Sequence, residues 1–86
     1  MDSYAIKKTG ARRFTVTVTS PKNLRWKPLD STGICIIRNS TTDGSSGKNY
    51  IWDLEVEKPG SYEFRMLHQG KDGVFRRLNI PIVASR

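Results

Sequence analysis

The sequence predicts an all-β protein in which seven short antiparallel strands pack as two layers. Apolar and polar residues alternate in several segments, and the clearest segment runs from Trp52 to Val56, where Asp53 and Glu55 separate the apolar side chains. This period of two is typical of a strand with one buried face. Turn residues interrupt the alternation every few positions, and no segment repeats apolar residues at helical spacing over three turns. Many short strands separated by turns favour a sandwich of two sheets.

In the first half of the chain we expect strands at residues 3–6, 13–20, 24–27 and 33–38. The strand at 13–20 alternates inward apolar residues with outward threonines. The strand at 33–38 contains Ile34, Cys35, Ile36 and Ile37, which predicts that both of its faces are covered and that the Cys35 thiol is a small buried apolar group. The polar, glycine-containing segment 39–48 is expected to form a flexible loop.

In the second half we expect strands at residues 49–57, 61–68 and 74–83. Residues 58–61, with Pro59 and Gly60, form the corner between the first two of these strands. Residues 69–73 form a hairpin turn in which glycine supplies a positive φ. Pro81 cannot donate a hydrogen bond to a neighbouring strand, so it indicates an edge position or a strand end.

Size and composition predict one small domain, residues 1–86, without a disulfide bond. The chain has 86 residues and one cysteine, so its stability must come from packing. Its N-terminus lacks the pattern of a signal peptide, and no apolar run approaches the ~18 residues of a membrane-spanning helix. We therefore expect a soluble protein that is synthesised in the cytoplasm and has no membrane partner.

Charge is distributed unevenly along the sequence. The formal net charge is +7. Residues 1–28 contain seven cations and one anion, residues 29–64 contain three cations and six anions, and residues 65–86 contain five cations and one anion. This pattern predicts complementarity with nucleic acid or with an acidic protein surface, although a β domain that is basic without such a partner is an equal alternative. We expect residues 1–12 to combine a first strand with a basic arm. The candidate partner-binding residues are Lys7, Lys8, Arg12, Arg13, Arg25, Lys27, Arg65, Arg76 and Arg77.

The positions of four core residues resemble those of immunoglobulin-like domains. A core residue on the second strand (Val16 or Val18), Trp26 on the third, Tyr62 after the Pro-Gly corner and Phe64 two positions later match that pattern. Both cysteines of antibody domains are absent, with Phe64 and a valine in their place. The chain therefore resembles the disulfide-free relatives, such as fibronectin type III, polycystic-kidney-type, and bacterial and phage immunoglobulin-like domains. The resemblance implies structural roles for Trp26, Tyr62 and Phe64, and we expect the Tyr62 ring to fill the core and its hydroxyl to bond a nearby backbone group.

No set of residues in the sequence forms a catalytic, cofactor or metal site. His68 is the one histidine, and we expect it at the surface near a loop. Asp53, Glu55 and Glu57 are expected to form a solvated strand face, with an acidic docking stripe as the alternative. The sequence therefore predicts neither an enzyme nor a small-molecule substrate.

Three functions remain open on these grounds. The first is a non-enzymatic structural or interaction module that docks on a protein assembly, and the resemblance extends this to a decoration or tail component of a viral particle. The second is weak, salt-dependent nucleic-acid binding through the basic arm and the last hairpin. The third is carbohydrate binding on Trp26, Tyr50 and Trp52, against which their alternation favours burial of both tryptophans.

Overall fold

Seven strands and no helix make up the regular structure in the described part of the chain. The computed structural model describes residues 3–20, 25–29, 31–44, 47–69, 73 and 75–85. The strands are β1 (Ser3–Gly10), β2 (Arg13–Ser20), β3 (Trp26–Pro28), β4 (Ile34–Asp43), β5 (Lys48–Val56), β6 (Gly60–Gln69) and β7 (Phe75–Ala84). All strand pairs are antiparallel, which confirms the predicted all-β, seven-stranded architecture.

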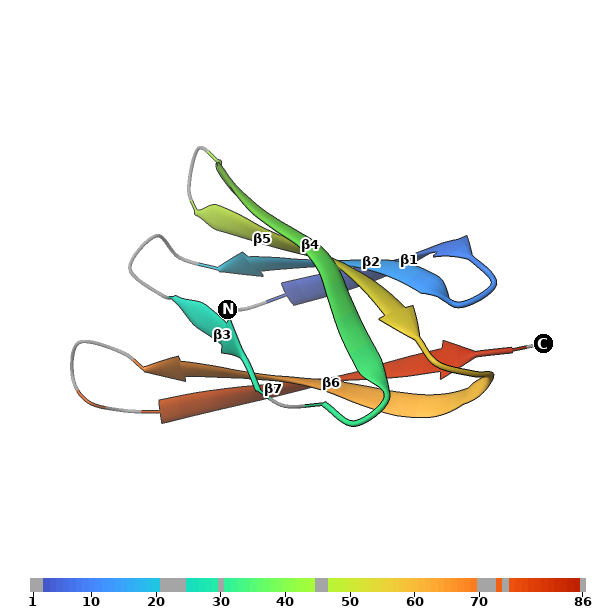
Figure 1. The fold of residues 1–86 in the computed structure, drawn as a ribbon. Coiled ribbons are helices and arrows are strands. Elements are labelled where there is room, and N and C mark those ends of the chain that lie inside the picture. The colour runs from blue at the N-terminus through green and yellow to red at the C-terminus, as the bar shows by residue number, and fades with distance from the viewer. Residues whose placement is uncertain are drawn as a thin grey trace.

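The strands form two sheets that face each other as the layers of a sandwich (Figure 1). One sheet has the order β1-β2-β5-β4, and the other has the order β3-β6-β7. Each sheet therefore has two edge strands, β1 and β4 in the first and β3 and β7 in the second. Pro81 lies in the edge strand β7, where its missing donor is tolerated.

The core lies between the two sheets and is built by the predicted alternation. On β2 and β5 every second residue is buried, and Val16 is paired with Trp52 across the two strands. Phe64 of β6 meets Trp52 edge to face, with 5.7 Å between the ring centres, so the two sheets contact through aromatic rings. The buried apolar residues are Phe14, Val16, Val18, Trp26, Tyr50, Trp52, Leu54, Val56, Phe64, Met66, Ile80, Ile82 and Ala84. Full burial of each large apolar side chain contributes about 1.5–3 kcal/mol.

Tyr62, the third residue of β6, closes one end of the core. Its hydroxyl donates a hydrogen bond of 2.7 Å to the Lys58 carbonyl, as expected for a bond to nearby backbone. Its ring is half-buried and packs against the core from the side. The ring leaves no room beside Gly33, where an added Cβ would lie 2.5 Å from Tyr62 Cε2, and Gly33 has a φ of 82°. Glycine is thus required at position 33 for two independent reasons.

The largest error in the predicted secondary structure concerns β4. This strand extends to Asp43, so residues 39–43 are paired with β5 and do not form the predicted loop, of which 45 and 46 lie outside the described residues. Asn39 is paired with Trp52 and Thr41 with Tyr50. Polar, β-branched residues suit an edge strand wetted on both faces, which is why the hydrophobic pattern gave no signal for a strand here.

The remaining differences are small shifts of strand ends, with one consequence for the basic arm. β1 continues to Gly10, so Lys7 and Lys8 lie in a strand opposite Thr15 and Phe14 instead of in an arm. β3 covers Trp26–Pro28 instead of 24–27, and residue 24 lies outside the described residues. In the predicted hairpin turn, Gly73 has the expected positive φ of 78°, and residues 70–72 are not among those described.

Candidate interaction surfaces

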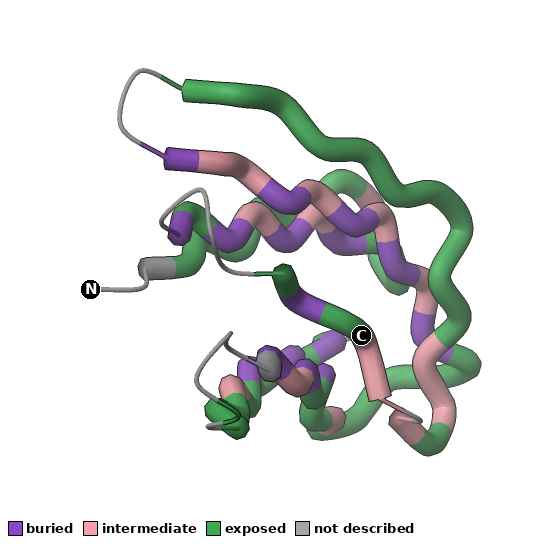
Figure 2. The backbone as a smooth tube through the Cα atoms, turned by 90° about the vertical axis from the view of Figure 1, so that its left-hand side faces the viewer, coloured by how far each residue is buried: buried purple, intermediate pink, exposed green. Residues whose placement is uncertain are grey.

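The edge strand β4 exposes a run of apolar side chains. Ile36 is 38% exposed, Ile37 is 49% exposed and Cys35 is exposed, so the prediction that this strand is covered on both faces, with a buried Cys35, was wrong. The physical reason is its position, because β4 pairs with β5 on one side only. Figure 2 shows an almost continuous exposed stretch along β4, beside the alternating burial of β5. A register shift between Ile36 and Arg38 places a bulge at Ile37.

A second surface lies on the outer side of the β3-β6-β7 sheet. We call it the basic face and define it by Arg25, Lys27, Leu67, Phe75 and Arg77. The strand pairing places Lys27 opposite Leu67 and Leu67 opposite Arg77. Arg25, Lys27, Leu67 and Phe75 line a hollow of about 330 Å³, in which Phe75 is 59% exposed. Arg65 and Arg76, which were also predicted to bind a partner, lie on β6 and β7 and are exposed.

His68 anchors the segment that leads into this face. It is buried, with 1% of its surface exposed, so the prediction of a surface histidine was wrong. Its Nδ1 lies 2.8 Å from the Arg25 carbonyl oxygen and 3.1 Å from the Arg25 amide nitrogen. The tautomer that carries its proton on Nδ1 donates to the carbonyl oxygen, and the tautomer that carries it on Nε2 accepts at Nδ1 from the amide. The imidazole also packs against Trp26, with 5.4 Å between ring centres, so His68 fixes the main chain from which the Arg25 side chain projects.

The other predicted basic residues lie on β1, on β2 and in the turn between them, and three of the four bond to protein groups through their side chains, whereas Lys7 lies on β1 opposite Thr15. Arg13 forms an ion pair of 3.0 Å with Glu55, and Arg12 donates a 2.9 Å hydrogen bond to the Glu57 carbonyl. Lys8 lies 3.4 Å from the Ser85 hydroxyl, just beyond the end of β7. Arg77 precedes Ser85 by eight residues of extended chain, so Arg77 of the basic face lies roughly 27 Å from the Ser85 position beside Lys8. The nine candidates therefore form two groups instead of one patch.

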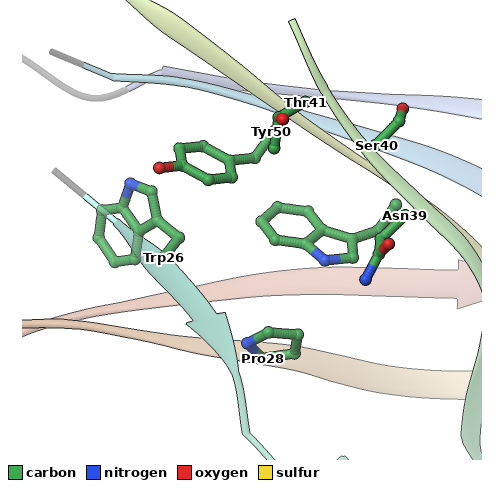
Figure 3. A pocket seen from close by; sticks show the side chains of 7 residues that line it. Trp26, Pro28, Asn39, Ser40, Thr41 and Tyr50 are labelled. Carbon is green, nitrogen blue, oxygen red and sulfur yellow. The ribbon is translucent and has the colours of Figure 1, made fainter. Parts of the chain in front are cut away.

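Three aromatic residues meet in a cavity of about 440 Å³ between β3, β4 and β5 (Figure 3). Trp26 is 5% exposed, Tyr50 is 7% exposed and Trp52 is 3% exposed, and the rings of Tyr50 and Trp52 stack with centres 5.9 Å apart. The expectation that both tryptophans are buried is confirmed, and Tyr50 is buried with them. Asn39, Ser40 and Thr41 of β4 complete one wall. The Trp26 Nε1 atom is buried and has no hydrogen-bond partner among the described residues.

Burial in this cavity affects the ionisation of Tyr50. Removal from water raises the pKa of the Tyr50 phenol above its ordinary value of 10.0, while the positive charge of Arg25 and a backbone hydrogen bond with Trp26 oppose that rise. The phenol therefore stays neutral at physiological pH. This makes Tyr50 a packing residue with a bonded hydroxyl instead of a proton-transfer group.

Acidic residues on the outer side of β5 bond to side chains of the neighbouring strand β2 instead of converging on one site. Asp53 accepts a 2.8 Å hydrogen bond from the Thr15 hydroxyl, and Glu55 pairs with Arg13. Among the described residues no group of three or more His, Cys, Asp or Glu side chains could hold a metal ion. The same residues include no helix long and apolar enough to cross a membrane.

No protein-family model, no curated protein and no solved structure matches the sequence. The fold and its surfaces define the class on their own. The chain is an antiparallel β-sandwich that exposes an apolar strand edge and a basic sheet face.

Proposed function

We propose that the protein is a non-enzymatic interaction module of immunoglobulin-like fold that docks on a protein assembly through the free edge of β4. The strand order β1-β2-β5-β4 facing β3-β6-β7 supports the immunoglobulin-like assignment, because constant-type immunoglobulin sandwiches have this order. The hydrogen bond from Tyr62 to the main chain four residues upstream supports it further.

The observation that carries the docking proposal is the exposed apolar edge of β4. Exposed edge strands template pairing with other chains, and proteins normally blunt them with charge, proline or a covering segment. β4 contains two charged residues, Arg38 and the terminal Asp43, and its apolar residues Ile36 and Ile37 remain in water. Covering these side chains would stabilise a complex by about 25 cal/mol for each Å² of apolar surface that is removed from water.

The occupant that fits this edge is an extended segment of the assembly. The bulge at Ile37 divides β4 into an apolar part and a regular part, Arg38 to Asp43, which keeps a continuous register with β5. A strand added beside the regular part would gain main-chain hydrogen bonds, and the isoleucines would provide apolar contact at its end. The family resemblance extends this proposal to large particles such as virions, and so to a virion-associated location.

Co-sedimentation with particles from the native source, followed by hydrogen exchange on the pelleted fraction, tests this proposal. We expect the wild type to pellet with the particles and the β4 amides at 38–43 to become protected. Ile37→Lys should abolish pelleting, whereas the matched control Val83→Lys, at a 64% exposed apolar residue of β7, should not. A soluble dimer that Ile37→Lys dissociates would identify a second copy as the occupant and overturn the proposal, as would pelleting without protection of β4.

A further inference from the structure

We infer that the basic face binds single-stranded nucleic acid, with Phe75 stacking on a base and Arg25, Lys27 and Arg77 contacting phosphates. This site lies on the second sheet and does not depend on docking through β4. It also differs from the site expected from the sequence, because the basic residues of β1 and β2 take no part in it.

The strand register builds the site across three strands. Lys27, Leu67 and Arg77 form one row on the outer side of the sheet. Neighbouring strands lie about 4.8 Å apart, so the two cations flank Leu67 with roughly 10 Å between their Cα atoms. Phe75 precedes Arg77 by two residues and therefore projects from the same side of β7.

The side chains of this face are available to a ligand. Phe75 is 59% exposed although it is a large aromatic residue, and it is absent from the core cluster. Arg25, Lys27 and Arg77 are exposed. Among the described residues on the outer side of this sheet, Glu63 is the one acidic residue. It lies opposite Pro81 and four residues from Leu67, which places it roughly 13 Å along the strand from the centre of the basic face.

The combination of an exposed ring and surrounding cations favours single strands over other polyanions. A base can stack on an aromatic ring of a sheet while its phosphates meet cations beside the ring, an arrangement that tolerates any sequence. Two of the three cations are arginines, whose planar guanidinium matches phosphate oxygens in pairs. In a duplex the bases are stacked on each other and are not free to stack on Phe75, and an acidic peptide has no base to do so.

The main chain of this face is already fixed before a ligand binds. His68 holds the backbone of Arg25 from inside the sandwich, and the Leu29 amide donates a 2.8 Å hydrogen bond to the Arg65 carbonyl at the other end of β3. The short strand β3 is therefore fastened to β6 at both ends. Phosphate contacts made by Arg25 and Lys27 then need ordering of side chains only.

Fluorescence anisotropy with a labelled 20-nucleotide oligothymidine and the full-length protein tests the inference. Three phosphate contacts on a single strand give a salt slope of about −2, so affinity should fall roughly 20-fold between 50 and 200 mM salt. Phe75→Ala should weaken binding about tenfold without changing the slope, because one stacked base is lost and no charge is removed. Arg77→Gln should weaken binding and reduce the slope by about 0.7.

Matched controls separate this site from a general effect of charge. Lys7→Gln removes the same charge on β1, and Val83→Ala removes an exposed apolar side chain on the same side of β7. Both controls, and Ile37→Lys on β4, should keep the wild-type affinity within twofold. No binding at 50 mM salt, an equal effect of Lys7→Gln and Arg77→Gln, or an unaltered affinity in Phe75→Ala would overturn the inference. Equally tight binding to duplex DNA, or equal displacement by polyglutamate, would overturn it too.

Discussion

Gly33→Ala should be one of the most damaging small substitutions in this protein. The φ of 82° at Gly33 lies in the left-handed region, which costs an alanine about 1–2 kcal/mol. The new Cβ would also lie 2.5 Å from Tyr62 Cε2, and displacing this packed ring should cost a further ~1–3 kcal/mol. We therefore expect a total loss of about 2–5 kcal/mol in the free energy of unfolding.

Gly73→Ala is a matched control for the backbone contribution. Gly73 has a φ of 78°, and nothing lies within 4 Å of an added Cβ, so this substitution should cost only the backbone part. Urea unfolding followed by fluorescence of the buried tryptophans measures both losses. With a denaturant slope of about 1 kcal/mol per M, the midpoint of Gly33→Ala should lie roughly 1–3 M below that of Gly73→Ala.

A double-mutant cycle assigns the difference to the tyrosine ring. Tyr62→Leu removes the Cε2 atom, so Gly33→Ala made in that background should cost only the backbone part, which gives a coupling of about 1–3 kcal/mol. Tyr62→Phe keeps the ring and should lose about 1 kcal/mol with the hydrogen bond to Lys58. Equal costs of Gly33→Ala in the wild-type and Tyr62→Leu backgrounds would refute the steric argument.

Three further predictions concern the interior. His68→Ala should cost about 3 kcal/mol, measured by urea unfolding, because it leaves a cavity and unpairs the Arg25 backbone; a loss below 1 kcal/mol would contradict the anchoring role. Leu54→Ala should cost about 2–5 kcal/mol in the same assay, since Leu54 is fully buried. Because burial raises the pKa of Tyr50, the unfolded chain loses this proton first, so the contribution of Tyr50 to stability is constant below pH 10 and falls as pH rises through the folded-state pKa. Tyr50→Phe should flatten the decline in unfolding free energy above pH 10, and identical slopes in the two proteins would exclude this origin.

The period of two predicted the sandwich because it records which face of a strand leaves water. Phe14, Trp52 and Phe64 are therefore buried as expected. The same signal was available for His68, which follows Phe64 and Met66 at intervals of two on β6. We predicted a surface position because histidine is polar, although the alternation places it on the buried face. Residues 39–43 carry no such signal because β4 is wet on both faces, and their strand geometry comes from pairing with β5.

The interaction surfaces were less predictable than the core because non-local register creates them. Lys27 and Arg77 are far apart in sequence, and only their pairing with Leu67 brings them into one row. Arg12 and Arg13 appear equivalent to these residues in a charge count, yet Arg13 pairs with Glu55 within the β1-β2-β5-β4 sheet and Arg12 bonds to the main chain of Glu57 just after β5. A count of cations therefore overstates the size of any single basic surface.

The arrangement of the first and last strands also determines how the sandwich would respond to a pulling force. β1 and β7 lie in different sheets and run in the same direction, so the start of β1 and the end of β7 are far apart along the strand axis (Figure 1). Tension between the start of β1 and the end of β7 would slide β1 along β2 and β7 along β6, so that the hydrogen bonds of each strand pair are loaded in shear and bear the force together. The two ladders would therefore resist such tension without first peeling open.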